Sequence, residues 1–244
     1  MTFTNWTIQI RTEDEQKCIP SLFEFVFQQF IEIFGAKLLG NEPCIVYNHL
    51  KSHDPMLIIS QSPIKIRTCS TLSSSLWGWA QYIYQISHEL THYIIRQYKE
   101  DKNSIIGWFE ETLCEAMSLY ILNTSSQRWK ECPLSYINPN YEKIIISFFK
   151  EVYLKTGPSS LKKCRSIDDL IKIEKTCKTE RISRSIERNY LFEVFCEYPE
   201  DISVFAHYPL YMQGDVQIDF KKWKADDSTP LIEKLESIQP KFIS

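Results

Sequence analysis

The chain has 244 residues, 43% of them hydrophobic and 14% aromatic, enough to bury a core in one large domain or two small ones. This apolar content argues against intrinsic disorder, and the low counts of glycine and proline exclude a low-complexity scaffold. The net charge is −3, with 28 basic and 31 acidic residues, so no strong positive field favours nucleic acid or an anionic membrane surface. We therefore expect neither nucleic acid nor membrane as a partner.

The cysteines and the N-terminal residues predict a reduced, cytoplasmic protein. The eight cysteines are spread along the chain without a C-x-x-C pair, which does not fit a disulfide scaffold. Residues 1–6 contain no basic region followed by an apolar run, so no secretory signal is expected there. The apolar stretch 22–34 is interrupted by Glu24 and Glu32 and is not expected to span a bilayer.

The predicted strands concentrate before position 70. Residues 5–10 alternate polar and apolar side chains, as a half-buried strand does. Residues 19–34 fit a helix that begins near Pro20 and Ser21 and ends at Gly35. Further strands are predicted at residues 44–48, 57–60 and 63–69.

After position 70 the periodicity becomes helical. Residues 76–96 place apolar side chains three and four apart, in one stripe, which indicates an amphipathic helix. A second helix is predicted over residues 105–123, after the polar connection 102–104. Later helices are predicted at residues 141–155, 168–175, 181–195 and 231–238.

These elements predict an α+β fold with strands early in the chain and a mainly helical C-terminal half. The loop at residues 157–160, which reads GPSS, is the best internal boundary. We therefore divide the chain into a core over residues 1–156 and a helical subdomain over residues 157–244. No feature of the sequence indicates an oligomeric state.

The stretch QISHELTHYIIRQ at residues 85–97 contains the pattern H-E-x-x-H at His88, Glu89 and His92. On a helix, residues four apart lie on the same face, so the two imidazoles can be directed at one point. That is what a tetrahedral zinc ion needs from two nitrogen ligands. Glu89 is offset from His88 by roughly 100° around the helix, which places its carboxylate beside a metal rather than on it.

Composition alone does not make this match decisive. The chain has five histidines, and with its content of glutamate the pattern would arise by chance in roughly one sequence in a hundred. A surface helix that carries two ordinary histidines is the alternative reading of this stretch.

The next predicted helix supplies carboxylates. A catalytic zinc needs a third protein ligand and one open position. Residues 108–115 read WFEETLCE, and Glu111 follows His92 after eighteen intervening residues. Glu115 lies one helical turn beyond Glu111 and could accept the second ring N–H of a ligating histidine. Carboxylates crowded on one helix face repel each other, and a cation would offset that repulsion.

This combination resembles the gluzincin zinc peptidases, in particular their aminopeptidase-like pattern of H-E-x-x-H followed by W-x-x-E. The resemblance covers only about residues 76–122, roughly a fifth of the chain. It implies a zincin-like domain with an N-terminal mixed sheet and one Zn²⁺ per chain. It also implies that His88, His92 and Glu111 are the zinc ligands, with Glu89 as the general base. Glu115 matches an acidic position one turn after the ligand glutamate in the wider group, which includes thermolysin-like enzymes.

The chain also departs from that family. No G-x-M-E-N-type exopeptidase motif precedes the helix, and the chain is much shorter than a full aminopeptidase of this kind. Aminopeptidase specificity is therefore not implied. Residues 64–69 occupy the position where zincins place an edge strand that binds extended substrate, which is an analogy of position only.

The resemblance implies hydrolysis of peptide bonds. Zinc acidifies water and polarises the scissile carbonyl, while Glu89 accepts a proton and passes it to the leaving amine. A further donor should stabilise the oxyanion, and Tyr208 or His207 in the stretch FAHYPLY is the preferred candidate. Other tyrosines in reach of this role are Tyr82, Tyr84 and Tyr211, although most of the thirteen tyrosines are expected simply to pack.

Other possible sites receive less support. His49 and His53 are four residues apart, but Pro55 and the preceding strand pattern predict a loop there, where this spacing loses its geometric meaning. Cys114 is predicted to be a small core residue and not a nucleophile. No serine-hydrolase elbow, P-loop or dinucleotide-binding glycine motif occurs.

The sequence therefore predicts a zinc metallopeptidase that acts on a peptide or protein substrate. The rival hypothesis is a zinc-bearing regulatory or interaction protein that keeps the site without peptidase activity. Glu89 favours the enzyme, because a structural zinc site has no need of a base beside the metal. A zinc hydrolase that acts on a non-peptide amide fits the same residues.

Overall fold

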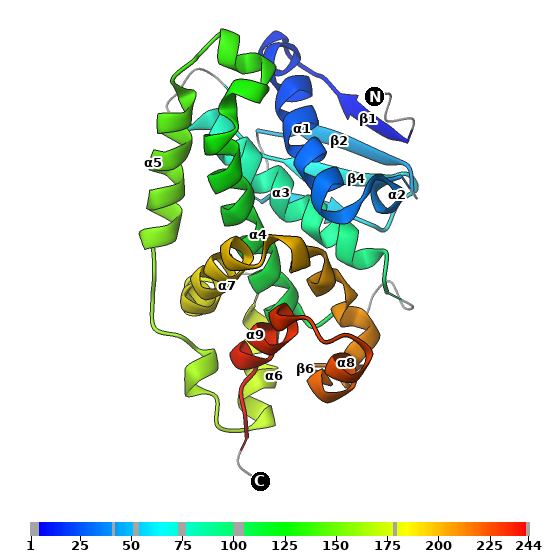
Figure 1. Ribbon diagram of the computed structural model, residues 1–244. Helices are drawn as coiled ribbons and strands as arrows, with labels where there is room; N and C mark the ends of the chain where they lie inside the picture. The colour runs from blue at the N-terminus through cyan, green and yellow to red at the C-terminus, as the bar shows by residue number, and fades with distance from the viewer. Residues whose placement is uncertain are drawn as a thin grey trace. The chain divides into compact units, whose positions relative to one another are not determined.

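A computed structural model describes residues 5–40, 42–50, 54–72, 77–99, 105–177 and 180–242 (Figure 1). Its contacts divide the chain into two compact units. Unit 1 comprises Met1–Ile94 and Ser118–Val152, and unit 2 comprises Ile95–Met117 and Tyr153–Ser244. The boundary that the sequence predicts after residue 156 stays a prediction.

Unit 1 contains the mixed sheet. Its strands are β1 (Trp6–Gln9), β2 (Cys44–Asn48), β3 (Met56–Ile58) and β4 (Ile64–Thr68), in the spatial order β1-β2-β4-β3. β2 pairs in parallel with both β1 and β4, whereas β3 is antiparallel to β4. The buried positions of β2 and β4 alternate with half-buried ones, so one face of these strands supplies the core. The predicted α+β class is confirmed.

The helices of unit 1 surround this sheet in sequence order. They are α1 (Glu13–Phe34), α2 (Ala36–Leu39), α3 (Gly78–Arg96) as far as Ile94, α4 (Gly107–Gln127) from Ser118, the short 3₁₀ turns Trp129–Glu131 and Pro133–Tyr136, and α5 (Tyr141–Leu154) as far as Val152. The helix predicted over residues 76–96 therefore forms, as does the one predicted over 105–123.

Helix α1 begins six residues earlier than the start predicted at residue 19. Thr12 caps the helix by accepting a hydrogen bond from the Glu15 backbone N–H, at 3.2 Å. Pro20 is accommodated inside the helix. The capping residue and three acidic side chains in the first turn stabilise this end of the helix, which explains the earlier start.

Aromatic side chains join β1 to two helices of unit 1. The Trp6 ring lies 5.7 Å from Phe23 and 4.9 Å from Phe27, both on α1, measured between ring centroids. The same ring lies 5.0 Å from Tyr93 on α3, at 64°. Large rings that meet edge to face bury much apolar area and hold their elements in a defined orientation. Trp6 therefore fixes α3 against the sheet.

Unit 2 is mainly helical. Beyond the N-terminal half of α4 it contains η3 (Leu161–Lys163), α6 (Ile167–Thr176), η4 (Arg181–Arg184), α7 (Ser185–Glu197), η5 (Pro199–Tyr211), β5 (Met212–Gln213), β6 (Gln217–Ile218), α8 (Phe220–Asp226) and α9 (Pro230–Ile238). The predicted helices near 168–175 and 231–238 are confirmed. The one predicted at 181–195 divides into a 3₁₀ turn and α7, and η5 and α8 were not predicted.

Two sequence-based expectations concern the whole chain. All eight cysteines fall within the described residues, and none of them forms a disulfide. In the part of the chain that the structure describes, no helix combines the length and apolar character needed to cross a bilayer. His53, Leu76 and the predicted connection at 102–104 lie outside the described residues.

Candidate functional site

Helix α3 is anchored to the sheet one turn before the H-E-x-x-H stretch. The Gln85 side-chain oxygen accepts hydrogen bonds of 2.9 Å from the Cys69 N–H and from the Ser70 hydroxyl. Asn48, at the end of β2, accepts from the Ser70 N–H and from Thr68. These groups are buried or partly buried, so the network is costly to break. It sets the position of α3 relative to the ends of β2 and β4.

The N-terminus of α3 is held by a tyrosine from α5. The Tyr141 hydroxyl accepts hydrogen bonds from the N–H groups of Trp79, at 3.0 Å, and Ala80, at 3.1 Å. First-turn N–H groups have no partner within their own helix, so an oxygen placed there stabilises the helix start. The Trp79 and Tyr141 rings also lie 4.7 Å apart. The segment that carries His88 and His92 is thus fixed at its beginning and near its middle.

The two histidines of α3 face each other. Their Nε2 atoms are 3.2 Å apart and the ring centroids 4.9 Å apart. Two nitrogens bound at 2.0–2.1 Å to one tetrahedral zinc ion are about 3.3 Å apart. The pair therefore fits two corners of such a site without a change of rotamer. An N–H···N hydrogen bond between two neutral rings gives the same separation.

Glu89 is buried on the same helix as the histidines. It is 3% exposed, as is His88, whereas His92 is half-buried. Burying a carboxylate next to two imidazoles is costly unless charged or hydrogen-bonding groups compensate it. The three residues of the motif are therefore enclosed, which a surface helix with two ordinary histidines would not require.

Helix α4 begins in unit 2 with a carboxylate cap. The Glu174 side chain of α6 accepts hydrogen bonds from the N–H groups of Gly107, at 2.7 Å, and Trp108, at 2.9 Å. A negative charge is favourable at this end of a helix. Position 107 requires glycine, because a Cβ atom there would lie 2.7 Å from the Cys177 sulfur and 2.8 Å from Glu174. Glu174 thereby sets where the carboxylates of α4 begin.

Three glutamates of α4 are buried in unit 2. Glu110 is 3% exposed, Glu111 7% and Glu115 1%, and Cys114 between them is fully buried. The sequence predicted one apolar face for this helix, but residues 107–119 are buried on all sides. A helix enclosed in this way needs a positive partner for each carboxylate.

Glu110 has two partners within unit 2. The Lys99 ammonium lies 2.8 Å from its Oε2, and both side chains are 4% exposed. The Tyr208 hydroxyl of η5 donates a hydrogen bond to the same oxygen. Burial and the neighbouring Glu110 carboxylate raise the pKa of Tyr208 well above its usual value. The single donor of Tyr208 is therefore committed to Glu110, and its predicted role at an oxyanion stays a prediction.

Glu115 lies among arginines. Its Oε1 is 3.7 Å from Arg184 Nη2 and 3.8 Å from Arg181 Nε, with Arg184 fully buried. Burial raises the pKa of Glu115 to about 7, although the arginines act in the opposite direction. Within unit 2 this carboxylate thus belongs to a buried ionic cluster. The hydrogen bond predicted from a histidine ring to Glu115 stays a prediction.

The remaining oxyanion candidates occupy packed positions. The His207 ring meets Tyr98 edge to face at 4.5 Å, and burial lowers the pKa of His207. Tyr211 stacks on Trp223 at 5.1 Å. In unit 1 Tyr82 is fully buried, and Tyr84 contacts Phe148 at 6.2 Å. Each of these rings contributes to packing, as most tyrosines do.

The second histidine pair has one described member. His49 is half-buried just after β2, and its backbone N–H donates to the Thr68 carbonyl at 2.8 Å. This bond belongs to an extended segment, as the sequence predicted. The four-residue spacing therefore lacks the helical register that brings His88 and His92 together.

Sequence reasoning did not find the basic residues that accompany the carboxylates of α4. Lys99, Arg181 and Arg184 reach Glu110 and Glu115 from segments before and after the helix. The signal that could have found them is the doublet Glu110-Glu111 inside an apolar stretch, because buried carboxylates require cationic partners.

Comparison with known proteins identifies no relative. No protein-family model, no curated protein and no solved structure matches the chain. The functional argument therefore rests on the residues and their geometry alone.

Proposed function

We propose that the chain is a zinc-dependent hydrolase of peptide bonds with a zincin-like catalytic core. The observation that carries the proposal is the 3.2 Å separation of the two Nε2 atoms on α3, with the buried Glu89 between the histidines in sequence. Nitrogen donors at this separation match two ligands of one tetrahedral zinc ion. A general base next to them is the residue that hydrolysis requires.

A side chain of α4 completes the proposed site. Glu111 is the third ligand implied by the spacing of the motif, and it is buried on this helix. Cys114 is the rival, because His88, His92 and Cys114 form a group of side chains that could hold a metal ion. We favour Glu111, since two histidines and one carboxylate leave a catalytic zinc with an open position, as in other metallopeptidases.

Each residue has a separate task in this proposal. Zinc in such a site acidifies water and polarises a carbonyl group. Glu89 accepts the proton released from the attacking water and delivers it to the amine that leaves. Gln85 keeps α3 at a fixed depth against the sheet, which holds the imidazoles in register with the substrate.

The proposal is tested by metal removal. Purified protein should contain zinc, and it should cut members of a mixed peptide library in an assay read by mass spectrometry. Phenanthroline should abolish the cutting, and added Zn²⁺ should restore it where Mg²⁺ does not, because Mg²⁺ prefers oxygen ligands in an octahedral arrangement.

Cleavage that is insensitive to the chelator would contradict the proposal. A zinc-loaded protein that cuts no peptide would instead support the rival hypothesis of a zinc-bearing regulatory or interaction protein.

A further inference from the structure

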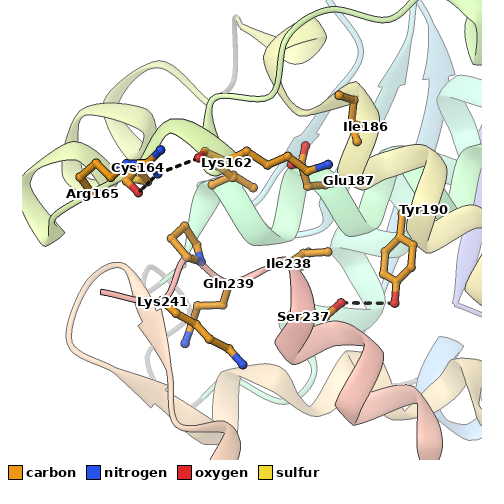
Figure 2. Close-up of a pocket in the computed structure, with 12 residues that line it drawn as sticks. Lys162, Cys164, Arg165, Ile186, Glu187, Tyr190, Ser237, Ile238, Gln239 and Lys241 are labelled. Atoms are coloured by element: carbon orange, nitrogen blue, oxygen red, sulfur yellow. Dashed lines mark hydrogen bonds between the residues drawn. The ribbon is translucent and has the colours of Figure 1, made fainter. Parts of the chain in front are cut away.

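A pocket of about 480 Å³ lies within unit 2, away from any residue of the H-E-x-x-H motif in sequence (Figure 2). Its walls come from η3 with the two residues that follow it, from α7, and from the end of α9 with residues 239–241. The volume falls within the range of about 300–1,000 Å³ that is usual for small-molecule sites.

The walls of the pocket are held in place by hydrogen bonds. The Ser237 hydroxyl donates to the Tyr190 hydroxyl at 3.2 Å, which joins α9 to α7 (Figure 2). The Gln239 side chain both accepts from the Ile218 N–H and donates to its carbonyl, at 2.8 and 3.1 Å. The segment after α9 is therefore tied to β6. A wall fixed in this way forms a pocket before any ligand binds.

Glu187 provides an unusual group on this lining. The residue is only 4% exposed, and its Oε1 accepts a short hydrogen bond from the Ser159 hydroxyl. Its Oε2 is buried, and no donor among the described residues reaches it. A buried carboxylate oxygen without a donor costs free energy, so it calls for a partner from outside the chain. That partner must donate hydrogen bonds or carry positive charge.

The other charges on the lining are positive. Lys162, Arg165 and Lys241 all line the pocket, and all three are exposed. The Arg165 guanidinium is oriented by hydrogen bonds from Nη1 to the carbonyls of Lys162, at 2.9 Å, and Cys164, at 3.2 Å. Three cations against the single carboxylate of Glu187 leave the lining with a net positive charge. An anionic group is therefore favoured at the mouth.

We propose that this pocket binds a small zwitterion that carries both an ammonium and a carboxylate group, as a free amino acid or a short peptide does. The ammonium donates to Glu187 Oε2, and the carboxylate is held by the cations at the mouth. The side chain of the ligand packs on the apolar part of the lining, which includes Leu161, Ile186 and Ile238. This inference is independent of the metal site.

The test compares ligands that lack one charge. Isothermal titration of the full chain at pH 7 should detect binding of L-leucine or of leucyl-leucine, and these two arms distinguish a free amino acid from a peptide. N-acetyl-leucine lacks the ammonium and leucinamide lacks the carboxylate, so each should bind at least about tenfold more weakly than the zwitterion. Mass spectrometry of the titrated dipeptide checks that it remains intact.

Matched variants assign the two ends of the ligand. Glu187→Gln keeps an acceptor for Ser159 but presents an amide N–H₂ in place of Oε2, so it should weaken binding of the zwitterion by about tenfold or more. Lys162→Met should weaken leucine without affecting leucinamide. Lys163→Met is the control, because Lys163 is an exposed neighbour that does not line the pocket, and it should bind as the native chain does.

Three results would overturn the inference. They are absence of binding for both leucine and leucyl-leucine at millimolar concentration, equal binding of N-acetyl-leucine and leucine to the native chain, and unchanged binding by Glu187→Gln. The first two comparisons use the native chain alone, so they decide the matter even if a variant fails to fold.

Discussion

Glu89→Gln is expected to lower the rate of peptide hydrolysis by a factor of about 10²–10⁴ while the bound zinc remains. The substitution preserves the size of a side chain that is 3% exposed, so the packing of α3 should be kept. It removes the group that accepts a proton from water, and the amide cannot replace it. The rate is measured on the same peptides that the native chain cuts, with the zinc content determined in parallel.

Glu15→Gln is the matched control for this prediction. Glu15 is also a buried glutamate of unit 1, at 4% exposure, and it accepts a hydrogen bond from the Arg11 N–H near the start of α1. This variant should hydrolyse peptides at close to the native rate. If Glu89→Gln kept its activity, Glu89 would not be the general base. Zinc loss in that variant would instead point to a structural role for the carboxylate.

Arg184→Met is expected to lower the free energy of unfolding by about 3–5 kcal/mol. Arg184 is fully buried, and it donates to the Thr112 hydroxyl at 3.2 Å and to the Glu180 carbonyl at 3.3 Å, besides facing Glu115. Removing it leaves the Glu115 carboxylate enclosed with only the more exposed Arg181 nearby. Urea unfolding followed by circular dichroism measures the loss.

Two variants separate this charge effect from lost packing. Arg128→Met removes an arginine that makes more side-chain hydrogen bonds, to Glu32 and Glu131, but at a solvent-exposed position. It should cost about 1 kcal/mol or less, because water compensates exposed charges. Adding Glu115→Gln to Arg184→Met should recover part of the lost stability. A loss as small as that of Arg128→Met would show that Glu115 is not a compensated buried charge.

Local patterns predicted the elements that carry their own signal. Residues 44–48 alternate between the two faces of a sheet and form β2, and the apolar stripe of residues 76–96 forms α3. The start of α1 was misplaced because Pro20 was read as a first-turn residue. The capping pattern from Thr12 to Glu15 was the better signal, since it pairs a capping hydroxyl with an acidic first turn.

Other elements lacked such a signal. The segment Pro199–Tyr211 forms a long 3₁₀ helix, whose threefold repeat differs from both the helical and the strand period used to read the sequence. The buried surroundings of α4 also escaped prediction. Its stripe was read as one apolar face, but burial on all sides depends on partners such as Arg184, which lies far along the chain.

The candidate site divides in the same way. The register of His88 and His92 is a property of one helix, so the sequence alone predicts that their rings meet. The third ligand is a different problem, because Glu111 and Cys114 lie on another helix, three residues apart. Which of them turns toward a metal depends on how α4 is rotated about its axis, and sequence spacing does not specify that rotation.

X-ray absorption at the zinc edge of the purified protein tests the central claim most directly. We predict one zinc per chain, with two imidazole nitrogens and otherwise only oxygen neighbours near 2.0–2.2 Å, as expected for His88, His92 and Glu111. A sulfur neighbour at about 2.3 Å would contradict this ligand set and assign the third position to Cys114. Protein purified without zinc, and unable to take it up, would contradict the site altogether.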